Sequence, residues 1–88
     1  APPADLLVTA KGSRAEVRFS SLAGAVYRIT RQPAEGEEQE LCRIAGTGGI
    51  IRYVDRTLQP GRAYLYRVTP LYSDGQAAAF SAEYLLSP

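Results

Sequence analysis

The stretch from Tyr53 to Val68 constrains the fold of this chain more than any other, because a Pro-Gly pair separates two extended runs. Pro60 fixes its φ at about −65° and Gly61 can adopt a positive φ, so the chain turns sharply there. After the turn, Tyr64 and Tyr66 share one face of a strand, since side chains alternate along a strand. A tyrosine just past such a turn can bury its ring and hydrogen-bond to the turn's backbone, which is called a tyrosine corner.

Short β-prone runs separated by turn residues recur along the rest of the chain. Apolar and polar residues alternate from Ala15 to Ser20, as in a strand with one buried face. The next run places Tyr27 and Ile29 on one face and Arg28 and Thr30 on the other. Strands are expected at residues 6–10, 15–20, 26–31, 40–44, 51–58, 64–69 and 76–86, the last one interrupted near residues 77–79. Seven strands without a helical stretch indicate an all-β antiparallel sandwich of two sheets.

The inward positions of these strands carry large apolar side chains and predict a single core. The structural residues expected in the core and at the corner are Phe19, Tyr27, Ile29, Tyr53, Leu58, Pro60, Tyr64, Tyr66 and Val68. A chain of 88 residues is long enough for one such core and too short for a second domain. Its only cysteine, Cys42, leaves no internal disulfide to support that core, and we expect an inert thiol.

The composition excludes most catalytic chemistry. The chain has no histidine, so Ser-His-Asp and Cys-His catalysis and histidine-based metal sites are ruled out. The carboxylates between Glu35 and Glu40 lack the alternating spacing of a calcium loop and predict a solvated hairpin. The Gly-rich segment 46–49 lacks the Lys-Ser/Thr of a phosphate loop and predicts a flexible connection. We therefore expect no catalytic residue, metal or cofactor, and no apolar run is long enough to insert into a membrane.

Several of these motifs together resemble the fibronectin type III domain: Tyr27-Arg28-Ile29, the run from Tyr53 to Leu58, the corner from Leu58 to Tyr64, Tyr66-Arg67-Val68 and Ser81. The resemblance covers residues 5–86, with residues 1–4 and 87–88 as linkers. It implies a seven-stranded Greek-key β-sandwich of immunoglobulin-like type, in which the first, second and fifth strands form one sheet. Phe19 stands where the family usually has Trp, and Pro70 stands where a small residue is common. Because Pro70 cannot donate to a ladder, the sixth strand should end, bulge or lose a neighbour there.

Four residues are candidates for binding a partner: Arg28, Arg67, Arg43 and Tyr72. The three arginines would form an outward basic stripe that holds an acidic glycan or an acidic protein. The alternative is a mixed charged face, in which outward Glu16, Glu40 or Glu83 separates the arginines. Tyr72 and Tyr84 are the only rings expected to be free, too few for a sugar platform or for base stacking, so nucleic acid is not expected as a partner.

The resemblance implies a non-catalytic accessory module, a spacer or protein-interaction domain, in a larger exported or cell-surface protein. The Arg-rich composition suggests a bacterial source, and the family resemblance suggests attachment to a glycan-degrading enzyme. Its partners would then be neighbouring domains of the same chain, another protein or a polysaccharide. Two alternatives are a binding module that uses the basic stripe or an edge strand, and a fragment of a eukaryotic receptor or adhesion protein.

Overall fold

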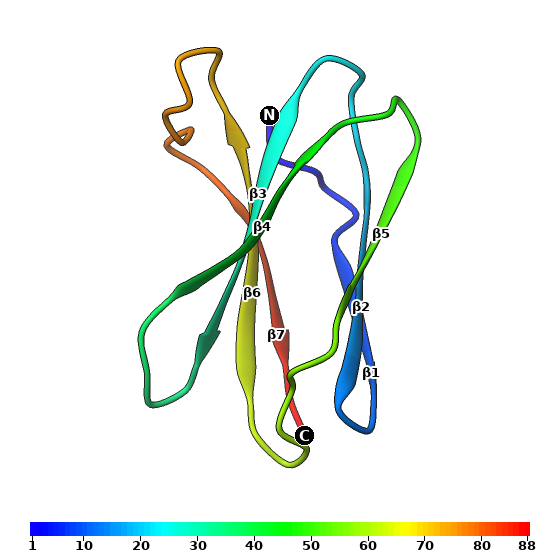
Figure 1. Ribbon diagram of the computed structural model, residues 1–88, viewed down its shortest axis with the longest axis vertical. Coiled ribbons are helices and arrows are strands. Elements are labelled where there is room, and N and C mark those ends of the chain that lie inside the picture. Colours follow the sequence, from blue (N-terminus) through cyan, green and yellow to red (C-terminus); the bar gives the residue numbers. More distant parts are fainter.

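The computed structural model describes residues 1–88 as an all-β structure of seven strands in two sheets (Figure 1). The strands are β1 (Leu7–Lys11), β2 (Arg14–Ser20), β3 (Val26–Pro33), β4 (Gln39–Ala45), β5 (Ile50–Asp55), β6 (Tyr64–Leu71) and β7 (Ala82–Leu86). The structure contains no helix that is long and apolar enough to cross a lipid bilayer.

All neighbouring strands pair antiparallel. One sheet has the order β1-β2-β5 and the other the order β4-β3-β6-β7, so the predicted division of strands between the sheets is confirmed. The two sheets face each other across one core, and the chain ends lie at opposite ends of the long axis (Figure 1). Strand β5 ends at Asp55, so Leu58 lies in the connection to β6 rather than in a strand.

Alternating side chains of both sheets fill the core, as expected for strands with one buried face. Phe19 of β2 meets Tyr27 of β3 edge to face, with 5.2 Å between ring centroids. Of the predicted core residues, the buried ones are Phe19, Tyr27, Ile29, Leu58, Tyr64, Tyr66 and Val68. Tyr53 is only half-buried and packs against the edge of this core.

The region around Pro70 explains the end of the last hairpin. Strand β6 continues through Pro70 to Leu71 because β3 pairs with it over its whole length, but β7 pairs only with residues 64–68. The predicted loss of a neighbour at Pro70 is thereby confirmed. The last strand is shorter than predicted: it begins at Ala82, and the segment before it contributes a single bridge between Leu71 and Ala77.

The connection between β4 and β5 is held more firmly than its glycines suggest. The Thr47 amide donates to Ser21 Oγ at 3.0 Å, and the Ser21 amide donates to the Gly49 carbonyl at 2.9 Å. Gly46 donates to the Ala25 carbonyl at 2.7 Å. These bonds tie the loop to the connection between β2 and β3.

Candidate functional site

The outer face of the four-stranded sheet holds the arginines that were predicted to form a basic stripe. Arg28 of β3 and Arg43 of β4 are direct cross-strand partners. Such like-charged neighbours repel each other. Glu40, on the same strand as Arg43, lies between them: its Oε1 is 2.9 Å from Arg28 Nε and 3.1 Å from Arg43 Nε. The carboxylate thus neutralises the repulsion within the domain.

Arg67 of β6 is surrounded by acceptors on the same face. Its Nε donates to Glu83 at 2.6 Å, and one terminal nitrogen donates to Glu38 and to Gln32, each at 3.1 Å. These carboxylates raise the pKa of Arg67, Glu83 first and then Glu38. Glu38 also accepts a 2.6 Å hydrogen bond from the Thr30 hydroxyl. This bond, and then the contact with Arg67, lowers the pKa of Glu38. Thr30 therefore lies on the outer face as predicted but is buried beneath Glu38.

Each arginine of the predicted stripe therefore has at least one carboxylate within ion-pair distance. Of the two arrangements considered from the sequence, the mixed charged face is the one present: Glu40 and Glu83 separate the arginines, as that alternative required. Glu38, which the alternation pattern did not single out, is the third carboxylate of the face. The sheet offers no unpaired row of cations to an acidic partner.

Tyr72, the fourth candidate, lies at the end of the same sheet and is 62% exposed. It lines a hollow of about 300 Å³ together with Arg43, Val26 and Leu71, so two of the four candidates share one surface depression. Tyr84 was also expected to be free. Instead it is half-buried against the core, because it occupies an inward position of β7 opposite Tyr66.

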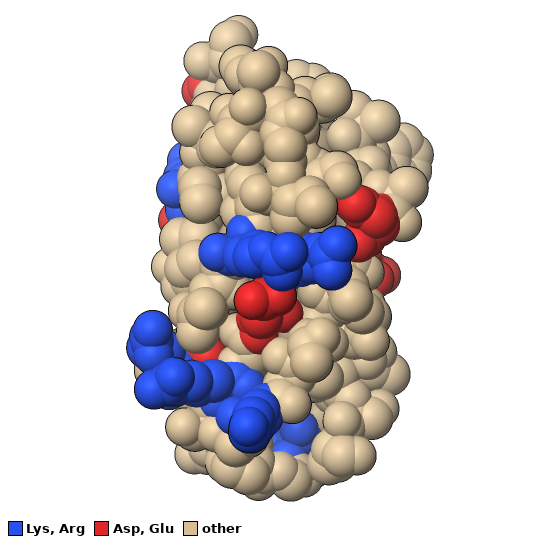
Figure 2. Space-filling view, turned by 90° about the vertical axis from the view of Figure 1, so that its right-hand side faces the viewer, with Lys and Arg blue, Asp and Glu red and all other residues tan.

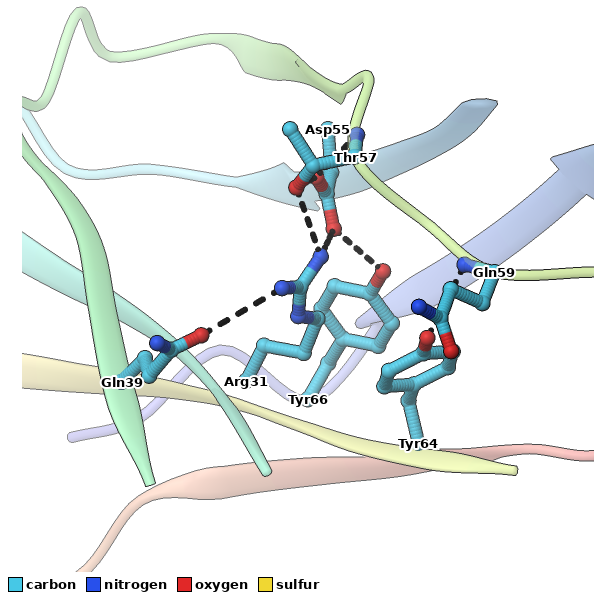
Figure 3. A network of polar contacts seen from close by, with 7 residues as sticks. All are labelled: Arg31, Gln39, Asp55, Thr57, Gln59, Tyr64 and Tyr66. Carbon is cyan, nitrogen blue, oxygen red and sulfur yellow. Dashed lines mark hydrogen bonds and ion pairs between the residues drawn. The ribbon is translucent and has the colours of Figure 1, made fainter. Parts of the chain in front are cut away.

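A buried polar network that was not predicted above joins the two sheets (Figure 3). Arg31 of β3 donates to Asp55 of β5 at 2.7 Å and to the Thr57 hydroxyl at 2.9 Å. Tyr66 of β6 donates its hydroxyl proton to the same Asp55 oxygen at 2.7 Å. The guanidinium also lies over the ring of Tyr64, 5.1 Å from its centroid. The side chains of the ion pair are 11% and 3% exposed, so solvent screens it little.

The protonation of this network follows from its contacts. Burial raises the pKa of Asp55, but the hydrogen bonds from Tyr66, Thr57 and Arg31 outweigh it and hold that pKa below its ordinary value. Burial and the bond to Asp55 raise the pKa of Tyr66. Burial lowers the pKa of Arg31, but the bond to Asp55 outweighs it and the net shift is upward. Both acid–base partners therefore stay charged and the phenol stays neutral near pH 7.

The sequence did contain a signal for this pair. Period-two alternation carries the inward face from Ile29 to Arg31 and from Tyr53 to Asp55. A buried charge needs a partner of opposite sign, so an inward Arg and an inward Asp on facing sheets predict each other. The network connects the two sheets, and none of its residues Arg31, Asp55 and Tyr66 lines a surface hollow.

Two tyrosine hydroxyls stabilise turns at opposite ends of the sandwich. The Gln59 amide donates to Tyr64 Oη at 2.9 Å, so the predicted tyrosine corner is confirmed. The Leu22 amide makes an equivalent 2.9 Å bond to Tyr27 Oη. In each case the tyrosine follows the amide by five residues and lies at the start of a strand of the four-stranded sheet, as the first residue of β6 and the second of β3.

The remaining reactive group is the half-buried thiol of Cys42. Burial, and then the charge of Glu40, raises its pKa. This disfavours the thiolate, which is the nucleophilic form.

Most charged groups of the four-stranded sheet and the core are held in internal pairs. No protein-family model and no curated protein matches this chain.

Proposed function

We propose that this chain is a non-catalytic accessory module of fibronectin type III kind, a Greek-key sandwich that spaces or docks neighbouring domains in a larger exported or cell-surface protein. The observation that carries the proposal is the position of the chain ends. They lie at opposite ends of a body of 36 × 24 × 19 Å, so domains joined to them are held apart along its long axis (Figure 1). A spacer of this kind needs no active site.

Three further features support the proposal. The strands are divided between the two sheets as the resemblance implies, and the Tyr64 hydroxyl accepts the hydrogen bond expected of a tyrosine corner. The Arg31–Asp55 network links the two sheets, which favours a stiff body over one whose layers slide. Stiffness matters here because a flexible linker gives a broad range of separations, whereas a folded sandwich gives one.

The experiment that tests the spacer function labels the two ends of the chain with a dye pair and measures single-molecule energy transfer. We expect one narrow population with a separation near the long dimension of the fold. In the parent protein, an unrelated sandwich of the same length should replace this module without loss of function, whereas a Gly/Ser linker should not. If only this particular sequence restores function, the module acts through specific contacts and the spacer proposal fails.

A further inference from the structure

The outer face of the three-stranded sheet carries basic side chains in two cross-strand rows. Lys11 of β1 is paired with Arg14 of β2, and Arg18 of β2 is paired with Arg52 of β5. We call these four residues the basic face. Figure 2 shows two groups of basic side chains on this side of the molecule, with one acidic group between them and another beside the upper basic group. The acidic residue at that position in the register is Glu16, which alternates with Arg14 and Arg18 on β2.

The basic face is less completely neutralised than the opposite sheet. Glu16 lies 3.2 Å from Arg52, and no carboxylate lies within ion-pair distance of the other three basic residues. Asp5 interacts with Arg18 through its charge but is not within ion-pair distance of it, and its two oxygens accept hydrogen bonds from the amide and hydroxyl of Ser20. Lys11 and Arg14 are exposed positions at the hairpin between β1 and β2.

The two sheets provide an internal comparison. Like charges directly opposite each other in a sheet are destabilising. On the four-stranded sheet the Arg28 and Arg43 pair is bridged by Glu40. On the three-stranded sheet Arg18 and Arg52 stand in the same relation, and Glu16 pairs with only one of them. An anionic group from outside the domain would fill the position that Glu40 occupies on the other face.

We propose that the basic face binds an acidic polysaccharide, a function independent of the spacer role. Guanidinium groups bind carboxylate and sulfate groups through paired hydrogen bonds, which suits a face rich in Arg. The two rows lie four residues apart along β2, or about 13 Å at the usual rise per residue. Glu16 between them repels a continuous anionic surface and leaves two separate anchoring points. A linear polymer that carries its charges at intervals fits this arrangement.

The same observations disfavour the other polyanions. A phospholipid surface or a nucleic-acid duplex presents closely spaced phosphates, which would meet Glu16 as well as the arginines. Single-stranded nucleic acid is bound through stacked aromatic rings. The outward positions of β1, β2 and β5 carry no aromatic residue. A neutral glycan would also require such rings, so the charge of the polysaccharide is the recognised property.

The test measures binding of the 88-residue chain to dextran sulfate, polygalacturonate and uncharged dextran at low and at moderate salt. We expect binding to the two acidic polymers, weakening as salt rises, and none to dextran. Arg18→Gln with Arg52→Gln should weaken binding at least about tenfold, because charge-assisted hydrogen bonds are lost. The matched control, Arg43→Gln with Arg62→Gln, removes the same net charge elsewhere and should change binding less than about twofold.

A gain-of-affinity variant makes the test independent of folding defects. Glu16→Gln removes the carboxylate between the two rows and releases Arg52, so it should tighten binding to dextran sulfate about two- to fivefold. Thermal unfolding of each variant checks that the fold is intact. The proposal is overturned if neither acidic polymer binds at low salt, or if the two double variants weaken binding equally. It is also overturned if anionic vesicles or oligonucleotides bind more tightly than the polysaccharides at equal charge.

Discussion

At the scale of single residues, Tyr64 and Tyr27 show how a polar atom on an otherwise apolar side chain fixes the path of the backbone. Each ring is buried in the core, and each hydroxyl accepts a hydrogen bond from an amide in the adjoining turn. Without that acceptor the amide would lose a hydrogen bond that is partly buried. A partly buried donor that loses its partner destabilises the fold, and this makes the hydroxyl a stabilising group separate from the ring.

The first prediction concerns this hydroxyl. Tyr64→Phe keeps the ring but removes the acceptor for the Gln59 amide, and it should lower the free energy of unfolding by about 1 to 3 kcal/mol. Denaturant unfolding measures the change. Tyr84→Phe is the matched control, because the Tyr84 hydroxyl makes no hydrogen bond and should cost less than about 0.5 kcal/mol. Equal losses in the two variants would show that the corner contributes nothing.

At the scale of elements, the loop between β4 and β5 derives its shape from its contact with the loop between β2 and β3. Gly46 packs so closely against the Leu22 backbone that a Cβ atom there would overlap the Leu22 carbonyl oxygen. Gly49, three residues later, leaves ordinary contact distance, with the nearest atom 3.8 Å from an added Cβ. Of these two glycines, only Gly46 is required by its surroundings.

The second prediction uses that difference. Gly46→Ala should destabilise the fold by about 1 to 3 kcal/mol, because the backbone of one loop must move to admit the methyl group. Gly49→Ala should be close to neutral, within about 0.5 kcal/mol. Thermal unfolding of the two variants side by side provides the measurement. A Gly46→Ala protein as stable as the Gly49→Ala protein would mean that the loops separate easily.

The sequence predicted those elements that depend on neighbouring residues, and it did not predict contacts between segments far apart in the chain. Alternation and turn residues placed all seven strands, and the corner from Leu58 to Tyr64 was recognised because its parts are contiguous. The hydrogen bonds of Thr47 to Ser21 join segments far apart in the sequence, and no local pattern announces them. The burial of Thr30 beneath Glu38 likewise depends on how the connection to β4 folds back over the sheet.

The same limit applied to the candidate site. Alternation correctly placed Arg28 and Arg67 on an outer face, but it could not tell which sheet would find enough carboxylates to neutralise its arginines. That depends on the register between strands, which brings Glu40 and Glu83 beside them and leaves Arg18 opposite Arg52. The sequence therefore predicted an excess of positive charge on the four-stranded sheet, where the structure shows that carboxylates pair with the arginines.

At the scale of the whole molecule, the Arg31–Asp55 network is the main polar link between the two sheets. Asp55→Asn leaves Arg31 buried without a counter-ion, so we expect a loss of about 3 to 5 kcal/mol in the free energy of unfolding. The exposed pair of Arg52 and Glu16 serves as the control, and Glu16→Gln should cost less than about 1 kcal/mol.

A severe loss in Asp55→Asn could leave too little folded protein to measure, so Tyr66→Phe serves as the milder variant. It removes one of the hydrogen bonds to Asp55 and should cost about 1 to 2 kcal/mol. The double variant Arg31→Met with Asp55→Leu removes both charges. It should be more stable than Asp55→Asn, because no unpaired buried charge remains. If the double variant is the less stable of the two, the pair stabilises the fold in its own right.

The last prediction follows from the pKa of Asp55, which lies below its ordinary value of 3.8 in the folded chain. Between the folded and the unfolded pKa, the unfolded chain binds more protons, so stability rises with pH there. The contribution of Asp55 is complete above pH 3.8 and disappears as the pH falls through the folded pKa. The raised pKa of Tyr66 acts oppositely: its contribution is complete below the ordinary value of 10.0 and is lost as the pH rises through the folded pKa.

Unfolding free energies measured from pH 2 to 11 should therefore form a plateau that falls on the acid side and above about pH 9, where the Cys42 thiol starts to titrate in the unfolded chain, followed by Tyr66 above pH 10. Because the chain has no histidine, no histidine titration interrupts the plateau near pH 6. Asp55→Asn should flatten part of the acid limb, and Tyr66→Phe part of the alkaline limb, since each removes one of the titrating groups. Glu38 and Asp5 also have lowered pKa values, so an acid limb unchanged in Asp55→Asn would assign the effect to those exposed carboxylates instead.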